Sequence, residues 1–173
     1  MPVAIDATVG GASANSFATL AEFTAYMDGR LNAGTFTAAS DDDKNRALVE
    51  ATRELTILSW EGLVVTTTQA LTWPRQSAVN PDSPTLDYFA IDVIPQRVKD
   101  ACLEMAFQFL KAGTTDVAAE AADLGITEKT VDVLTTRYDP RIRNTGLRRY
   151  PRAYDRIRPL LGIVAGVRSV VRA

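Results

Sequence analysis

Apolar side chains recur at spacings of three and four residues in three stretches of the chain, and this period predicts three amphipathic helices. The apolar positions of the first stretch are Phe17, Leu20, Phe23, Met27 and Leu31. Those of the second stretch are Ala47, Leu48, Ala51, Leu55 and Leu58. Those of the third stretch are Val98, Ala101, Cys102, Met105, Ala106 and Phe109. We therefore expect a core built from three packed helices.

Capping residues predict where these helices begin and end. Asn15 or Ser16 can cap the first helix. Ser40 is the expected N-cap of the second, and the three aspartates that follow it oppose the positive end of the helix dipole. Pro95 fits the first position of the third helix, and Gly113 its C-terminal end.

A β-hairpin is predicted between the second and third helices, near residues 63–94. Residues 63–73 are rich in valine and threonine, which favour extended structure, and Pro74 ends this run. Residues 76–87 contain two prolines with Asn, Asp and Ser and indicate a surface loop. Residues 88–94 can then return as the partner strand.

Weaker patterns predict four further elements. Residues 3–9 alternate as a short strand does, and residues 130–138 alternate as an extended arm. Residues 116–124 are rich in alanine and favour a helix. A short helix over residues 151–161 would carry its apolar side chains on one side, namely Tyr154, Ile157, Leu160 and Leu161.

The predicted fold is mainly α: a small bundle of three to four helices with a β-hairpin and an extended C-terminal arm. Charge supports a division into a helical domain, residues 1–136, and a basic arm, residues 137–173. The helical domain carries 9 basic and 19 acidic residues, whereas the arm carries 10 arginines and only two aspartates. The arm therefore has a balance of +8 in a chain of net charge −2, and this asymmetry predicts an acidic partner.

The composition argues against catalysis. The chain has no histidine, which excludes most hydrolase triads and most zinc enzymes. Cys102 is the only cysteine and falls on an apolar helix face, where a core role is expected. Asp41, Asp42 and Asp43 project about 100° apart on a helix and cannot converge on one metal ion. We expect no enzymatic activity, no cofactor and no metal site.

Neither a secretory signal nor a membrane span is expected. The N-terminus lacks a basic region followed by a long apolar run. The longest apolar stretch, residues 160–167, falls far short of the roughly 18 residues that a span requires. These features predict a soluble protein made in a cytoplasm, without a membrane partner.

The tripeptide Trp73-Pro74-Arg75 is distinctive and has two interpretations. It can anchor the predicted hairpin on the helices, with Arg75 stacked on an indole or paired with a carboxylate. Alternatively, it forms a contact at a subunit boundary, where Trp and Arg are enriched. The candidate structural or subunit-contact residues are Trp60, Gln69, Trp73, Pro74 and Arg75.

The basic arm has three interpretations. It can bind nucleic acid through its arginines, with Tyr138, Tyr150 and Tyr154 as stacking platforms. It can dock on another protein, or it can be a solvated tail. Eight large aliphatic residues argue against the tail and, with the absence of lysine, favour protein docking with ordering on contact. The candidate docking residues are Arg148, Arg149, Tyr150, Tyr154, Arg156, Ile157, Arg158, Leu160, Leu161, Val164, Arg168, Val170, Val171 and Arg172.

Several segments, in this order, resemble a family of tailed-phage proteins whose members often carry the label "DnaT-like single-stranded-DNA-binding protein". The matching residues are Thr8 to Gly10, Asn15 to Phe17, Glu22, Tyr26, Lys44, Ala47, Leu48, Ala51, Thr52, Trp60, Gly62, Gln69, Leu71, Trp73 to Arg75, Ile94, Pro95, Val98, Ala101, Tyr150, Pro151 and Arg158 to Leu161. One departure is Asn80-Pro81, where many relatives have a glycine-rich turn.

Proteins of this pattern resemble the head-to-tail adaptors of tailed phages. The resemblance implies a ring, commonly of twelve copies, below the portal of the virion neck, after assembly in the host cytoplasm. The expected partners are the portal protein, bound by the arm, neighbouring copies, a tail-side protein, and genomic DNA that passes without sequence specificity. The balance of −10 in residues 1–136 fits a channel wall that does not grip DNA.

Two tests separate the adaptor from the alternative, a single-stranded-DNA-binding replication accessory. Removing residues 148–173 is expected to leave the fold intact and abolish portal binding. An arm that neutralises phosphates should lose affinity steeply with salt, whereas a protein dock should resist salt better.

Overall fold

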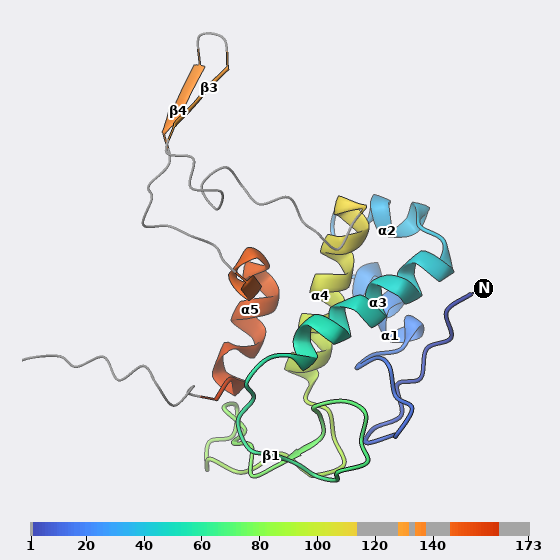
Figure 1. Ribbon diagram of the computed structural model, residues 1–173, viewed down its shortest axis with the longest axis vertical. Helices are drawn as coiled ribbons and strands as arrows, with labels where there is room; N and C mark the ends of the chain where they lie inside the picture. The colour runs from blue at the N-terminus through green and yellow to red at the C-terminus, as the bar shows by residue number, and fades with distance from the viewer. Residues whose placement is uncertain (1, 114–127, 132–133, 138–145, 163–173) are drawn as a thin grey trace, which may run out of the picture.

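Helices dominate the described part of the chain, which in this computed structural model comprises residues 2–113, 128–131, 134–137 and 146–162 (Figure 1). The helices are α1 (Leu20–Asp28), α2 (Gly34–Ala38), α3 (Asp41–Thr56), α4 (Gln96–Ala112) and α5 (Pro151–Ile157), with the 3-10 turns η1 (Gly146–Arg149) and η2 (Arg158–Leu160). The strands are β1 (Leu63–Val64), β2 (Arg75–Gln76), β3 (Glu128–Val131) and β4 (Leu134–Arg137). The predicted mainly helical fold with a small antiparallel hairpin is confirmed.

Helix α4 is the central element, because α1, α2, α3 and α5 all contact it. Its N-cap is Pro95, one position before the predicted place of this residue, and its C-cap is the predicted Gly113, whose left-handed φ of 67° suits glycine. Helix α3 begins after the predicted cap Ser40, whose side chain accepts a hydrogen bond from the Asp43 amide. The apolar faces predicted for both helices are buried in one core.

Helix α1 begins later than predicted. Its N-cap is Thr19, which forms a capping box with Glu22, so Asn15 and Ser16 lie before the helix. The Asn15 side chain instead accepts a hydrogen bond from the Asp6 amide at 2.8 Å and donates one to the Ala4 carbonyl at 2.9 Å. The predicted apolar residue Leu31 lies beyond the helix and is 88% exposed.

The N-terminal segment is not the strand that its alternation predicts. The Val3 amide donates to a carboxylate oxygen of Asp42 at 2.7 Å, and the Asn45 side chain donates to the Val3 carbonyl at 2.9 Å. Side chains of α3 therefore take the place of a partner strand.

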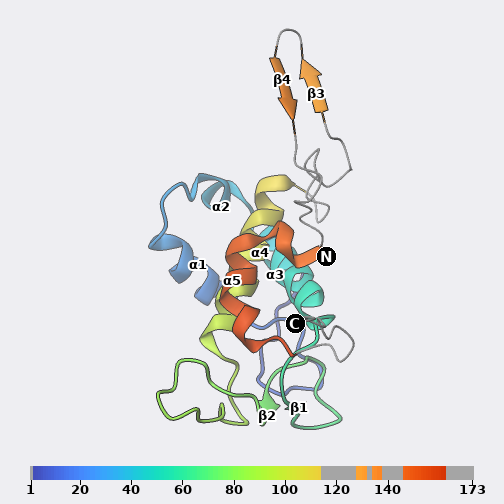
Figure 2. The ribbon, with the colours of Figure 1, turned by 90° about the vertical axis from the view of Figure 1, so that its left-hand side faces the viewer.

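The hairpin after α3 has a different partner from the predicted one. Strand β1 pairs with β2, in the register Leu63 with Gln76 and Val64 with Arg75, and Tyr88 makes only an isolated bridge with Val79. Gly62 precedes β1 with φ of 75°, and a Cβ there would lie 2.4 Å from the Gln76 carbonyl oxygen. Only glycine fits this close approach, which brings the two short strands together at one end of the helices (Figure 2).

Residues 147–162 pack on the helical core and do not form an extended arm. Ala153, Ile157 and Leu160 are fully buried, and Tyr150 lies edge-on to Phe109 with ring centroids 5.6 Å apart. The Glu61 amide donates to the Leu160 carbonyl at 3.0 Å. The short helix predicted over 151–161 is confirmed as α5 and η2, but a boundary at residue 137 separates it from the core to which it belongs.

Some predictions concern residues outside the described ranges. These are the helix over 116–124, the platform Tyr138, and the docking residues Val164, Arg168, Val170, Val171 and Arg172. Among the residues that are described, no helix is both long enough and apolar enough to cross a membrane.

The buried position of Leu160 predicts a large effect on stability. Leu160→Ala should lower the free energy of unfolding by about 2–5 kcal/mol, because it leaves a cavity where η2 meets the core. Arg158→Ala, two residues away and exposed, is the matched control and should change it by less than about 0.5 kcal/mol. Urea denaturation followed by circular dichroism measures both, and equal effects would contradict the packing of η2.

Candidate nucleic-acid interface

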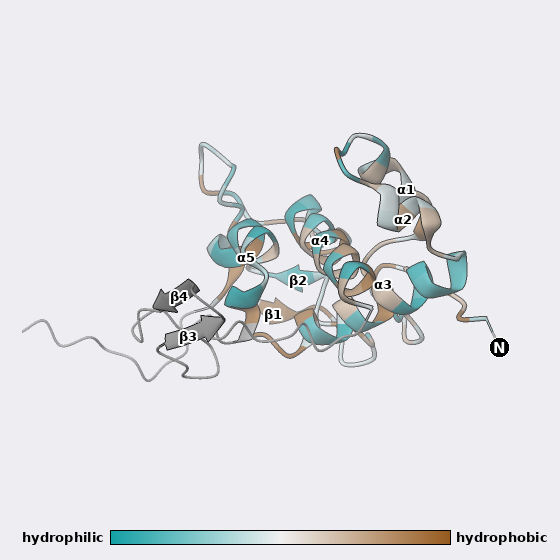
Figure 3. Ribbon diagram, turned by 90° about the horizontal axis from the view of Figure 1, so that it is seen from above, coloured by the Kyte–Doolittle hydropathy of each residue, from teal (hydrophilic) through white to brown (hydrophobic). Residues whose placement is uncertain are grey.

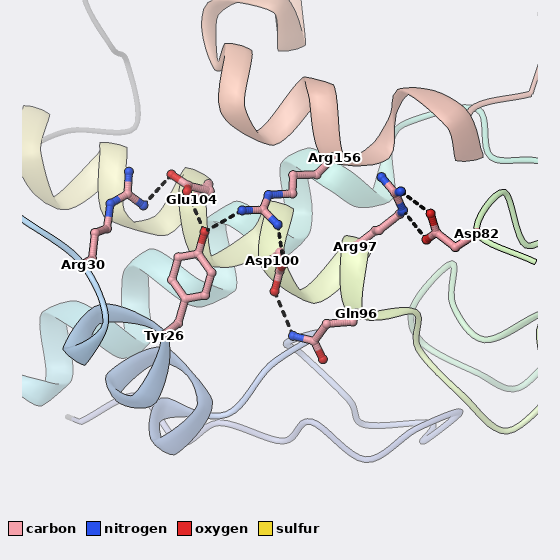
Figure 4. A network of polar contacts seen from close by, with 8 residues as sticks. All are labelled: Tyr26, Arg30, Asp82, Gln96, Arg97, Asp100, Glu104 and Arg156. Carbon is pink, nitrogen blue, oxygen red and sulfur yellow. Dashed lines mark hydrogen bonds and ion pairs between the residues drawn. The ribbon is translucent and has the colours of Figure 1, made fainter.

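A chain of polar contacts crosses α4 and joins α1 to α5 (Figure 4). The Tyr26 hydroxyl of α1 donates to Glu104 Oε1 at 2.6 Å and accepts from Arg156 Nη2 of α5 at 3.3 Å. Arg156 also donates to Asp100 Oδ2 at 2.7 Å. The carboxylates of α4, four residues apart, therefore hold α1 and α5 on either side of one helix face.

This environment changes the acidity of the Tyr26 phenol. Burial, together with the hydrogen bond to the Glu104 carboxylate, raises the pKa of Tyr26 to about 12. The phenol therefore remains a neutral donor throughout the physiological range, and the network stays intact there.

Two further ion pairs lie in or beside this network. Arg30 approaches Glu104 Oε2 at 2.7 Å, and Arg97 pairs with Asp82 through two nitrogens. The hydrogen bonds of the Asp82–Arg97 pair lower the pKa of Asp82 and raise that of Arg97. These cations are already matched by carboxylates.

A hollow of about 230 Å³ lies beside this network and is lined by cations and amides. Its lining residues are Arg30, Leu31, Asn32, Phe107, Gln108, Lys111 and Arg152, and we call it the basic hollow. None of these residues is acidic. Arg30 and Lys111 both lie over the Phe107 ring, with the Arg30 Cζ and the Lys111 Nζ at 5.0 and 5.7 Å from its centroid.

Two cations of the basic hollow, Lys111 and Arg152, have no carboxylate partner within the described ranges. Arg152 is exposed and makes no ion pair there, and Lys111 contacts only an aromatic face. Arg30 also lines the hollow, but its guanidinium is already paired with Glu104 at 2.7 Å. Guanidinium and ammonium groups gathered in this way suit a phosphate oxygen.

A second group of cations lies along the outer side of α5, which is hydrophilic (Figure 3). Arg148 lies over the Tyr154 ring, with Cζ 5.9 Å from the centroid. Arg158 follows Tyr154 by four residues and is exposed. Neither arginine is paired with a carboxylate in the part of the chain that the structure describes. We call these three residues the α5 outer face.

A larger hollow, of about 640 Å³, lies between α2, α3 and α4. Asp43 and Glu50 line it together with Arg46 and apolar side chains. Its carboxylates would repel a phosphate, so it is the less suitable of the two for nucleic acid.

The Trp73-Pro74-Arg75 motif has the anchoring role. Trp73 is buried edge-on to Trp60 and to Phe89, with centroid distances of 5.7 and 5.9 Å. Within the described ranges, Arg75 neither stacks on an indole nor pairs with a carboxylate. It donates instead to the carbonyls of Glu61 and Gly62, at 2.7 and 2.5 Å.

Gln69 completes this anchor through its side-chain amide. Its Oε1 accepts hydrogen bonds from the amides of Val65 and Thr66, both at 3.0 Å, and its Nε2 donates to the carbonyls of Leu71 and Pro74. These contacts are of the kind that the anchoring interpretation expects, although the predicted partners of Arg75 differ. A subunit contact through Trp60, Trp73 or Arg75 stays a prediction.

The predicted docking residues separate into distinct environments. Ile157 and Leu160 are core side chains and cannot reach a partner while α5 stays packed. Arg156 is bound within the network, whereas Arg148 and Arg158 are exposed and Tyr154 is half-buried. Arg149 is exposed, while Tyr150 and Leu161 are half-buried. A docking role for the exposed residues among them stays a prediction.

Sequence reasoning missed the cations that line the basic hollow beside Arg152. Arg30 follows α1 and Lys111 ends α4, so they lie 81 positions apart in the chain and meet only through helix packing. The sequence contains one partial signal of the charged contacts between α4 and α5. Asp100 and Glu104 are four residues apart, as are Arg152 and Arg156, so each pair lies on one face of its helix.

Two candidates for chemistry remain, the Cys102 thiol and a metal site. Burial raises the pKa of the Cys102 thiol to about 12, so it is protonated and unreactive. Within the described ranges, no three His, Cys, Asp or Glu residues are grouped as a metal site would need.

The Tyr26 contact predicts a distinct alkaline titration. The absorbance difference between wild type and Tyr26→Phe should report a phenol ionising near pH 12, because burial and Glu104 disfavour the phenolate. The folded pKa exceeds the unfolded value of about 10, so the stability from this group is complete below pH 10 and is lost as the pH rises toward 12. A difference that titrates near pH 10 would contradict the contact.

No curated protein and no solved structure matches the chain. The family described as "Putative DnaT-like ssDNA binding protein" matches over residues 1–173. This match confirms the family part of the resemblance seen in the sequence. Its description names single-stranded DNA binding, the alternative function, and says nothing of a head-to-tail adaptor. Because the match covers the whole chain, the protein belongs to this family.

Proposed function

We propose that the protein binds single-stranded DNA and that the basic hollow holds its backbone phosphates. The observation that carries this proposal is the lining of the hollow, in which Lys111 and Arg152, without a carboxylate partner among the described residues, lie with Arg30, which is paired with Glu104. The family description supports the choice of a single strand as the ligand.

Arg30 is held in place before a strand arrives, whereas the side chains of Lys111 and Arg152 are exposed. Arg152 is carried by α5, which Ile157 fixes in the core, and Arg30 is held against Glu104 and Phe107. A side chain that is already ordered loses little conformational entropy on binding, so Arg30 is the preorganised cation of the hollow.

The rim of the hollow offers groups for unpaired bases. Leu31 is 88% exposed and presents an apolar surface, while the side-chain amides of Asn32 and Gln108 can donate and accept hydrogen bonds. Such groups contact base faces and edges that a single strand exposes and a duplex hides.

Loss of one cation should weaken binding without unfolding the protein. Arg152→Ala and Lys111→Ala should each weaken affinity for a fluorescent thymidine oligonucleotide about tenfold, the effect of one charge-assisted contact. Each should also reduce the slope of log affinity against log salt by about 0.7, because one phosphate contact is lost. Fluorescence anisotropy across a salt series measures both quantities.

Arg53→Ala is the matched control for these variants. It removes one exposed arginine from α3, where Arg53 pairs with Glu50 outside the hollow. Its affinity and salt slope should equal those of the wild type. Equal losses in all three variants would show a diffuse charge effect and contradict a site at the hollow, as would a wild type that does not bind.

A second candidate function is the head-to-tail adaptor, and one observation favours it. Apolar side chains are exposed on the loop before α4, and nucleic-acid binding gives them no role. In this proposal the protein forms a ring on the portal in the virion neck, joins a tail-side protein and conducts DNA, without catalysing a reaction. Arg148, Tyr154 and Arg158 then remain available to the portal.

Co-expression with the portal of the same genome tests the adaptor function. Electron microscopy of the purified product should show a second ring stacked on the portal, because repeated weak contacts around a ring become a stable joint. A folded protein that does not associate with a folded portal would exclude this candidate and leave the DNA-binding proposal in place.

A further inference from the structure

The loop before α4 exposes four large apolar side chains within eight residues. Leu86, Tyr88, Ile91 and Val93 are 71%, 65%, 58% and 44% exposed. We call these four residues the apolar loop. Large apolar side chains that are exposed together, and not scattered singly, are typical of an interaction surface.

The apolar loop is held in shape by its own hydrogen bonds. The Asn80 amide donates to the Asp87 carbonyl at 2.7 Å, and the Phe89 amide donates to the Ala78 carbonyl at 3.0 Å. The Asp87 carboxylate accepts hydrogen bonds from the hydroxyls of Ser83 and Thr85, at 2.8 and 2.6 Å. A loop fixed in this way presents its apolar side chains at low entropic cost to a partner.

The backbone directs these side chains outward. Phe89 turns inward and packs on Trp73, so its neighbour Tyr88 points to the opposite side. Leu86 has a φ of 55°, in the left-handed region that a bulky residue rarely adopts. The side chain of Leu86 is exposed, so packing in the core does not explain this backbone conformation, and a role at the surface does.

The edge of the apolar loop is acidic, which identifies the chemistry of its partner. Asp87 and Asp92 are exposed within the loop, so the surface combines apolar groups with negative charge. A complementary surface combines apolar groups with unpaired cations. The α5 outer face supplies these cations, since Arg148 and Arg158 lack a carboxylate partner among the described residues, and the half-buried ring of Tyr154 beside Arg148 supplies an apolar surface.

We propose that the apolar loop of one copy docks on the α5 outer face of a second copy. The two surfaces differ, so the contact is heterologous, and repetition generates a ring or a filament. The basic hollow uses Arg30, Lys111 and Arg152, none of which takes part, so assembly and the proposed DNA binding are independent. The inference rests on the two surfaces and not on the DNA-binding proposal.

Blocking each surface separately tests the contact. Analytical ultracentrifugation of nuclease-treated protein compares wild type with Tyr88→Asp, which blocks the loop, and Arg158→Glu, which blocks the α5 outer face. Wild type should associate as its concentration rises, and each variant should sediment as an 18.8 kDa monomer. An equal mixture of the two variants should form dimers and nothing larger, because only one intact loop–α5 pair remains.

Ile57→Asp is the matched control, because Ile57 is 78% exposed but lies outside both surfaces. It should associate as the wild type does. Circular dichroism checks that each variant is folded, and Tyr88→Ser and Arg158→Gln replace any that is not. The proposal is overturned by a wild type that stays monomeric, by an Arg158 variant that still associates, by a mixture without dimers, or by a control that loses association.

Discussion

The packing of α5 and η2 against α4 is the interaction on which the rest of the structure depends. Ile157 and Leu160 close the core that α3 and α4 begin, and Arg156 reaches across α4 to Asp100 and to the Tyr26 hydroxyl of α1. One short segment near the C-terminus thereby fixes the relative positions of three helices. An arginine-rich sequence is used here as an integral part of a helical core.

The same packing creates the surface chemistry of the molecule. Carboxylates of α4 neutralise the arginines that point inward, while Lys111, Arg148, Arg152 and Arg158 are left without a carboxylate among the described residues. Positive charge is therefore concentrated on α5 and the end of α4, although the whole chain carries a net charge of −2. This local concentration is what an anionic strand would encounter.

Much of the helical core follows from the sequence, because α3 and α4 combine a regular apolar period with strong ends at Ser40 and Gly113. The hairpin partner does not follow, because side chains set its register: Arg75 and Gln69 bind backbone groups that hydrophobicity does not reveal. The basic hollow also lies beyond sequence reasoning, since Arg30 and Lys111 meet only after α1 and α4 pack. The burial of Ile157 and Leu160 could not be predicted for a different reason. Aliphatic residues that pack in a core and those that dock on a partner have the same pattern in a sequence.

Hydrogen–deuterium exchange with and without a thymidine oligonucleotide tests the central claim, that a single strand lies in the basic hollow, most directly. The account predicts slower exchange in two segments that border the hollow, residues 29–33 after α1 and residues 147–153 at the start of α5, with α3 unchanged. Unchanged exchange in both segments under saturating oligonucleotide, or protection confined to other parts of the chain, would contradict it.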